Sequence, residues 1–214
     1  MKYQIAELFM TGRTRNLPKG QVIIFEGDPA DTLYYIIEGY VKVYSILHTG
    51  VERIINIEGP GDFFPLTSYL SGSGVVRYFY ECMGEVKLQI ISAEKLRDKI
   101  KGNFDFAQML VNYSNLKQQR FLQRIDILSV NNARRKVVSL LAFLLEKTGK
   151  PETLSQLSIT LTQQDIANMC ALTRETTSAQ LIRLRREGVI SGTKKMMIDT
   201  RKLDKLKDKL DITN

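Results

Sequence analysis

Tryptophan is absent from this chain of 214 residues, and histidine and cysteine are scarce, with one and two residues respectively. The two cysteines, Cys82 and Cys170, lie far apart in the sequence, which excludes a disulfide framework and the closely spaced thiolates of a structural zinc site. The single histidine, His48, excludes metal centres that need several imidazole ligands. No Ser/His/Asp, Cys/His or phosphate-loop constellation is visible, so we expect neither a metal site nor enzymatic activity.

Long apolar runs are also missing. The longest, Val137–Leu145, includes Ser139 and is far shorter than the roughly 20 residues that span a bilayer. The N-terminal segment MKYQIAELFMTGRTRN has no apolar stretch before its arginines, unlike a secretory signal peptide. We therefore expect a cytoplasmic protein with no membrane partner.

Glycine and proline are nearly confined to the first half of the chain. Eleven of the 14 glycines and four of the five prolines precede residue 103, and residues 103–148 contain neither. Because these residues interrupt regular structure, the pattern indicates a turn-rich first section, an unbroken helical second section and a mixed third section.

The first section has the pattern of short strands joined by tight turns. Glu38-Gly39 and Met83-Gly84 suit hairpins, and Gly59-Pro60-Gly61-Asp62 is a typical turn cluster. Short strands at this spacing favour an antiparallel sandwich or barrel over an alternating α/β fold. The expected strands are residues 21–25, 33–37, 40–46, 53–57, 75–80 and 86–91.

The second section predicts one helix from about Asn103 to Val130, with two apolar sets separated by the polar stretch KQQR (117–120). A helix this long needs more burial than a small roll offers, which favours pairing with a second copy of the chain. The polar stretch would then lie midway along a dimer seam, solvated or facing a ligand. A monomeric helix on the roll with a wet outer face is the alternative. The apolar sets are Phe106, Met109, Leu110, Tyr113 and Leu116, then Phe121, Leu122, Ile125 and Leu128.

Positive charge is concentrated in the last section. Residues 1–130 have 15 Lys+Arg against 14 Asp+Glu, a net charge of +1, whereas residues 131–214 have 16 against 9, a net charge of +7. A basic module attached to a neutral one is typical of proteins that bind a polyanion such as nucleic acid.

Residues 161–190 have the pattern of two short helices joined by a tight turn. Thr162, three residues before Asp165, can cap the first helix, and Thr173 can cap the second after the turn at Ala171-Leu172. This pattern suits a helix-turn-helix whose second helix enters the major groove of DNA, with an ordinary amphipathic helix pair as the alternative. The second helix would bury Leu181 and Leu184 and expose Arg174, Glu175, Thr177, Ser178 and Gln180.

Four features occur in this order: the segment IFEGDPADTLYYIIEGYVKVY, the segment PGDFF, a long helix and a basic helix-turn-helix with TRETTS. Together they resemble the Crp/Fnr family of bacterial transcription regulators. The resemblance implies an α+β fold in three parts: an antiparallel β-roll (jelly roll) that senses an effector at 1–104, a dimerisation helix at 105–130 and a winged helix-turn-helix at 131–214. It also implies a homodimer that binds double-stranded DNA at a pseudo-palindromic site and contacts RNA polymerase. Asn131-Asn132 fits the family's hinge and can cap the next helix.

The resemblance also implies DNA contacts. Arg174 and Glu175 match base-reading positions, where arginine can bind guanine O6 and N7 and glutamate can accept a hydrogen bond from cytosine N4. The position after Ser178, usually arginine in the family, is Ala179, so the standard half-site is not expected. The alternative for Arg183, Arg185 and Arg186 is a solvated basic helix end that does not contact DNA. The predicted DNA-contact residues are Gln163, Gln164, Thr173, Arg174, Glu175, Thr176, Thr177, Ser178, Ala179, Gln180, Arg183, Lys194 and Lys195.

The family's cyclic-AMP anchors are missing. Members that bind cyclic AMP have Gly-Glu and Arg-Ser where this chain has Pro65-Leu66 and Val75-Val76, and two valines offer a cyclic phosphate no polar side-chain contact. Cyclic AMP is therefore disfavoured, unless Arg77 substitutes through a register shift of the loop 71–74. The effector-pocket residues are predicted to be Pro65, Leu66, Val75, Val76, Arg77, Gln119 and Arg120.

No cofactor is predicted. The chain lacks the cysteine cluster that would hold an iron–sulfur centre. His48, the only candidate haem ligand, is expected at the surface. Three alternatives stay open for what the protein senses: a redox change at Cys82 or Cys170, an unidentified small molecule, or no effector at all. A cupin-type enzyme is disfavoured by the single histidine. A C-terminal module that binds a protein instead of DNA is the main rival function, and its binding would be less salt-dependent.

Overall fold

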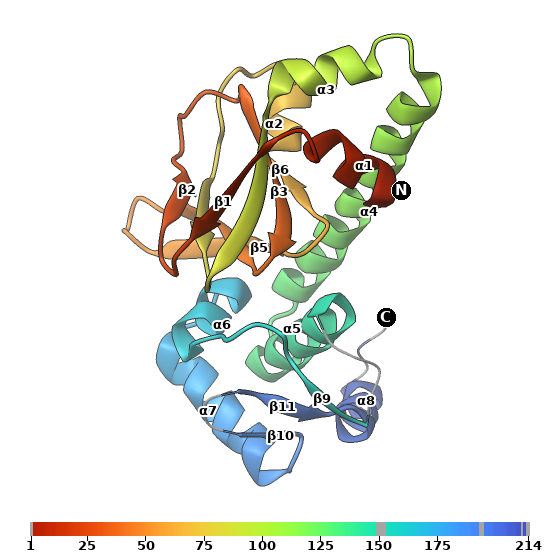
Figure 1. Cartoon of the computed structure of the whole chain (residues 1–214). Helices are drawn as coiled ribbons and strands as arrows, with labels where there is room; N and C mark the ends of the chain where they lie inside the picture. Colours follow the sequence, from red (N-terminus) through yellow and green to blue (C-terminus); the bar gives the residue numbers. More distant parts are fainter. Residues whose placement is uncertain (1, 149–152, 193–194, 211, 213–214) are drawn as a thin grey trace. The chain divides into compact units, whose positions relative to one another are not determined.

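The computed structural model of the chain describes residues 2–148, 153–192, 195–210 and 212 (Figure 1). The chain divides into two compact units, residues 1–120 and 121–214, and the break falls inside the long helix α4 (Phe104–Ser129). Within the described ranges, no helix combines the length and the apolar character that crossing a bilayer requires.

The N-terminal unit is an antiparallel β-roll with helices at its ends. One sheet has the strand order β1-β8-β3-β6 and the other β2-β7-β4-β5. The α+β fold class with a jelly-roll first part is therefore confirmed. Its elements are α1 (Lys2–Phe9), β1 (Arg13–Leu17), β2 (Val22–Ile24), β3 (Thr32–Glu38), β4 (Val41–Ile46), β5 (Glu52–Glu58), β6 (Phe63–Phe64), α2 (Leu66–Leu70), β7 (Phe79–Cys82), β8 (Val86–Ser92), α3 (Ala93–Ile100) and the first part of α4.

Both predicted hairpins are wrong in their pairing. Strands β3 and β4, which flank Glu38-Gly39, belong to different sheets, and so do β7 and β8, which flank Met83-Gly84. Gly39 has a φ of +88°, and a Cβ there would lie 2.3 Å from the Glu85 carbonyl oxygen, so the chain crosses between the sheets at a turn that requires glycine. Turn chemistry alone does not distinguish this crossing from a hairpin. The strand expected at 75–80 begins only at Phe79.

Two apolar clusters fill the roll. The first lies between the roll and α4 and includes Phe106, Met109, Leu110 and Tyr113, as predicted, whereas Leu116 is 47% exposed. The second lies between the two sheets and consists of Leu17, Ile24, Ala30, Ile36, Val41, Val43, Phe64, Val76, Tyr80, Cys82, Val86 and Leu88.

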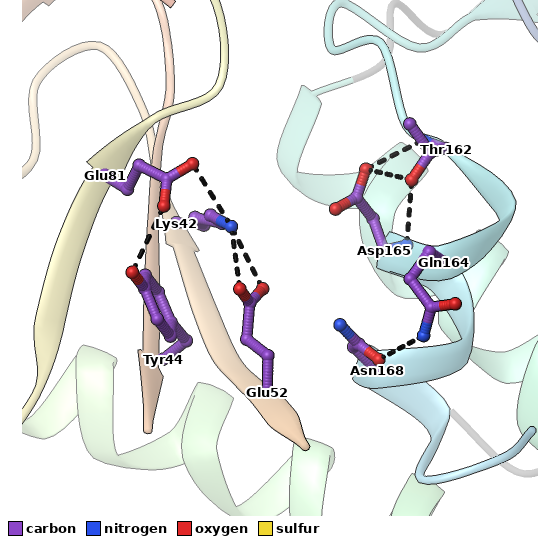
Figure 2. A network of polar contacts seen from close by, with 8 residues as sticks. All are labelled: Lys42, Tyr44, Glu52, Glu81, Thr162, Gln164, Asp165 and Asn168. Carbon is purple, nitrogen blue, oxygen red and sulfur yellow. Dashed lines mark hydrogen bonds and ion pairs between the residues drawn. The ribbon is translucent and has the colours of Figure 1, made fainter. Parts of the chain in front are cut away.

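The outer face of the sheet β2-β7-β4-β5 has a polar network (Figure 2). Lys42 forms ion pairs with Glu52 at 3.0 Å and Glu81 at 3.3 Å, and the Tyr44 hydroxyl donates a hydrogen bond to Glu81 at 3.1 Å. Burial, reinforced by the charge of Glu81, raises the pKa of Tyr44 to about 12. These cross-strand contacts tie three neighbouring strands together.

The C-terminal unit is a helix-turn-helix with a three-stranded sheet of order β10-β11-β9. Asn132 caps α5 as predicted, because its Oδ1 accepts a hydrogen bond from the Arg135 amide at 3.1 Å. Strands β10 and β11 pair antiparallel, as expected for the wing of a winged helix-turn-helix, while β9 and α8 were not foreseen. The elements after α4 are α5 (Ala133–Thr148), β9 (Leu154–Gln156), α6 (Gln163–Cys170), α7 (Arg174–Arg186), β10 (Ile190–Ser191), β11 (Met197–Asp199) and α8 (Thr200–Lys209).

Candidate nucleic-acid interface

The first helix of the pair, α6, begins with a capping box (Figure 2). The Thr162 hydroxyl accepts a hydrogen bond from the Asp165 amide at 3.0 Å, and the Asp165 carboxylate accepts one from the Thr162 amide at 2.8 Å. Both bonds satisfy amides that a helix start leaves without a partner. The apolar residues of α6 are buried: Ile166, Ala167, Met169 and Cys170.

The turn between α6 and α7 has one residue in the left-handed region. Ala171 has a φ of 53°, and the Leu172 amide closes the turn on the Ala167 carbonyl at 3.1 Å. Thr173 then caps α7 by accepting a hydrogen bond from the Thr176 amide at 3.1 Å. Both predicted caps are therefore confirmed, and they fix where the second helix starts.

Helix α7 has one face in the core and one in solvent. Leu181 and Leu184 are buried, as predicted, and Arg174 and Glu175 are exposed. The expectation that Thr177 faces outward is wrong, because Thr177 is 0% exposed. It lies four residues before Leu181 and so shares the buried face, which excludes it as a DNA contact in this conformation. The other outward candidates, Thr176, Ser178 and Gln180, are partly buried, and Ala179 is exposed.

The C-terminal end of α7 is held by charge pairs. Glu187 forms ion pairs with Arg134 at the start of α5 and with Arg183, whose Nε lies 3.2 Å away. The hydrogen bond from Arg134 lowers the pKa of Glu187, so the carboxylate is ionised at neutral pH. Arg183 nonetheless stays largely exposed, as do Arg185 and Arg186, which leaves a cationic surface beside the solvent face of α7.

The remaining predicted DNA contacts lie on α6 and in the loop between β10 and β11. Gln163 is partly buried, and the exposed Gln164 donates a hydrogen bond from its Nε2 to Asn168 at 2.8 Å (Figure 2). Lys195 is exposed in the loop between β10 and β11. Lys194 lies outside the described residues.

Arg124 was not foreseen in the sequence. It lies on the C-terminal part of α4, is almost fully buried, and donates a hydrogen bond to the Met169 carbonyl at 2.6 Å, at the C-terminal end of α6. Burial lowers the pKa of Arg124, and its Nε and Nη1 find no hydrogen-bond partner within the described part of the chain. A cation at a helix C-terminus stabilises that end, so Arg124 couples α4 to the first helix of the pair.

Two family models match the chain. A cyclic nucleotide-binding domain matches residues 14–103, and a Crp-like helix-turn-helix domain matches residues 135–209. The chain belongs to the Crp/Fnr family of transcription regulators. It is accordingly a DNA-binding transcription regulator, and the exposed surface of α7 lies on the helix that the family's DNA-binding domain uses.

The similar proteins are distant in sequence, although the matches cover most of this chain. A CRP-like cAMP-activated global transcriptional regulator of Mycobacterium tuberculosis is 27% identical over 192 residues, or 88% of this chain and 85% of the relative. The anaerobic regulatory protein of Pasteurella multocida is 27% identical over 184 residues, which is 84% of this chain but 65% of that protein's length. The structure of FixK2 from Bradyrhizobium japonicum has the same fold, with a TM-score of 0.79 at 21% identity, covering 92% of this chain and 98% of that chain.

The residues at the family's first cyclic-AMP position are part of the core in this Crp/Fnr chain. Pro65 and Leu66 are buried, and Leu66 belongs to the cluster between the roll and α4. At the second position, Val75 is exposed and Val76 is packed between the sheets with Phe64 and Tyr80, whose rings stack at 4.7 Å. Arg77, Gln119 and Arg120 are exposed. Leu66 and Val76 therefore belong to two different apolar clusters.

Lys117, by contrast, is not in the solvated or ligand-facing position expected for the KQQR stretch. Its ammonium forms ion pairs with Glu58 of β5 and with Asp62, 3.5 Å away. Burial by itself lowers the pKa of Lys117, but the charges of Glu58 and Asp62 outweigh it and the pKa is raised. The Tyr113 hydroxyl joins the group by donating to Asp62 at 3.4 Å. Helix periodicity places Lys117 on the same face as Tyr113, a signal that the sequence contained.

Both thiols are buried. Burial raises the pKa of Cys82 to about 11 and that of Cys170 to about 12, so both are protonated at neutral pH. His48 is exposed in the turn between β4 and β5, as predicted. Nowhere in the described chain do three or more His, Cys, Asp or Glu side chains gather as they would around a metal ion.

Proposed function

We propose that this regulator acts as a homodimer, that its two α7 helices bind a pseudo-palindromic operator, and that cyclic AMP is not its effector. The observation that carries the proposal is an exposed stripe on α4. Val111 is 58% exposed and Ile125 56% exposed, although both are large apolar residues on one helix. A second copy of the helix would remove this surface from water.

The stripe has the spacing of a two-stranded coiled coil. Its members alternate three and four residues apart along α4, which is the repeat that places side chains along one seam between paired helices. All of them are exposed or half-exposed, while the buried face of α4 packs on its own chain. The stripe consists of Phe104, Ala107, Val111, Ser114, Gln118, Phe121, Ile125 and Leu128.

A charge placed on the stripe tests the dimer. Ile125→Glu is expected to convert the dimer to a monomer in light scattering after gel filtration, and to reduce operator affinity, because two half-sites are no longer bound together. Asn112→Glu adds the same charge to an exposed position of α4 outside the stripe and serves as the matched control. A parent protein that is monomeric at micromolar concentration contradicts the dimer.

The operator follows from the dimer. Two α7 helices related by a two-fold axis would enter successive major grooves about 34–36 Å apart, so selection from a random DNA pool should recover two inverted half-sites. Glu175→Ala is expected to cost about 1–3 kcal/mol on the selected site and to relax preference at one base pair. Glu94→Ala, on an exposed position of α3, is the control. If Glu175→Ala leaves selectivity unchanged, the assignment of the base-reading residues is wrong.

Salt separates DNA binding from the rival function. Several phosphate contacts would make affinity fall steeply between about 50 and 200 mM salt, whereas a C-terminal unit that binds a protein through apolar surface would not respond in this way. A protein that binds no duplex at low ionic strength contradicts the proposal.

By the family's pattern, we place the protein in the cytoplasm with RNA polymerase as a further partner.

Cyclic AMP is disfavoured by what occupies its family positions. Leu66 and Val76 are part of the two apolar clusters, and neither has a group that could bind a ribose hydroxyl or a phosphate. We expect no cofactor in the roll. Cyclic AMP at millimolar concentration should change neither the melting temperature nor the DNA affinity, and a shift in either one contradicts this expectation.

A further inference from the structure

The solvent face of α7 has two apolar residues, Ala179 and Ile182, between its first turn and its basic C-terminal end. Glu175, Ala179 and Ile182 are spaced four and three residues apart, so they lie on one face of the helix. All three are exposed, and Ile182 is 44% exposed. This is the face that would enter the major groove, because it begins at Glu175 and lies opposite the buried Leu184.

This apolar strip has a cationic border. Arg183 and Arg185 are exposed on its two sides, and Arg186, four residues after Ile182, ends it. Guanidinium groups here complement phosphates on either side of a groove, which fixes the position of the helix without specifying sequence. The side chains between them would then face base edges. The strip is therefore continuous with the surface of the helix that binds DNA.

Alanine and isoleucine side chains have no hydrogen-bonding group, which limits what they can recognise. In the major groove, the C5 methyl of thymine is the only methyl group that the standard base pairs present. An apolar side chain placed over guanine would instead desolvate the O6 and N7 acceptors without giving them a donor. The strip thus favours thymine and disfavours guanine at the same step.

We propose that Ala179 and Ile182 are specificity-determining residues that contact thymine methyl groups, so that each half-site has thymines beside the base pair contacted by Glu175. The proposal rests on the proposed function, since it needs α7 in the major groove. It assigns a positive role to Ala179, where the family's usual arginine would bind guanine.

The sharpest experiment changes the DNA and leaves the protein folded as it is. Each thymine of the selected operator is replaced singly by deoxyuridine, which lacks only the methyl group. We expect about fourfold weaker binding at each contacted thymine, the equivalent of the ~0.8 kcal/mol gained by burying one methyl-sized group. Thymines outside the half-sites serve as the control and should show no change.

Protein variants then assign each methyl to a side chain. Ile182→Ala should abolish the deoxyuridine effect at the thymine that Ile182 contacts and keep it at the thymine that Ala179 contacts. Ala179→Arg should shift preference at its position from thymine to guanine, because arginine can bind guanine O6 and N7. Arg185→Ala is the matched control. Losing a phosphate contact should weaken binding to the selected operator and to its deoxyuridine-substituted version by the same factor.

The possible results separate this inference from the proposed function. If the selected operator is bound specifically but no deoxyuridine substitution changes affinity by more than twofold, the inference is overturned and the proposed function stands. If deoxyuridine weakens binding equally in the parent and in Ile182→Ala, Ile182 is not a methyl contact. If no operator is selected at all, the proposed function itself fails.

Discussion

Replacing Lys117 with methionine is expected to destabilise the roll strongly. Lys117 is only 16% exposed, and its removal takes the cation away from the buried carboxylates of Glu58 and Asp62. Removing one partner of a buried ion pair typically costs 3–5 kcal/mol, and we expect about 3 kcal/mol because Lys117 keeps some solvent contact. At roughly 2–4 °C per kcal/mol for a chain of this size, the melting temperature should fall by roughly 6–12 °C.

Circular dichroism during heating and urea unfolding measure the loss. Lys101→Met is the matched control, because Lys101 and its partner Asp98 are exposed and 3.9 Å apart, and such pairs contribute about 0–1 kcal/mol. The triple variant Lys117→Met, Glu58→Gln, Asp62→Asn should recover most of the stability, since it leaves no buried carboxylate without its cation. A triple variant as unstable as the single one, or a single variant that melts with the parent, refutes the reasoning.

Three further predictions concern single side chains. Thr162→Ala should cost about 1 kcal/mol of unfolding free energy because the capping box is lost, whereas Thr162→Ser keeps the hydroxyl and should cost less; equal losses would contradict the cap. Thr177→Val should stabilise the protein by about 1 kcal/mol without weakening operator binding, because the buried Thr177 hydroxyl has no hydrogen-bond partner among the described residues; a loss of DNA affinity would restore it as a contact. Cys82 and Cys170 should react slowly with Ellman's reagent at pH 8 in the native protein and rapidly in urea, because pKa values of about 11 and about 12 leave little thiolate; fast reaction of the native protein would show a reactive thiol.

Most differences between the predicted and the observed structure lie where contacts are non-local. The turn at Gly39 has the chemistry of a hairpin, yet it joins two facing sheets, because the approach of the Glu85 backbone decides which strand lies beside it. Strand β1 has four exposed residues before Leu17 and no alternation that a pattern could detect. Thr177 is the local exception: its polarity favours an outward position, but its spacing from Leu181 and Leu184 places it on the buried face.

Local features could be predicted from the residues alone. The caps at Asn132, Thr162 and Thr173 are bonds between residues three apart, so the N-terminal ends of α5, α6 and α7 follow from the residues at their starts. Tertiary structure alone decided the partners of Lys117 and Arg124, because Glu58 and Met169 are distant in sequence and approach only when strand and helix pack. Hydrogen bonds within one helical turn depend on a few neighbouring residues, whereas a buried cation acquires its partners only when distant elements fold around it.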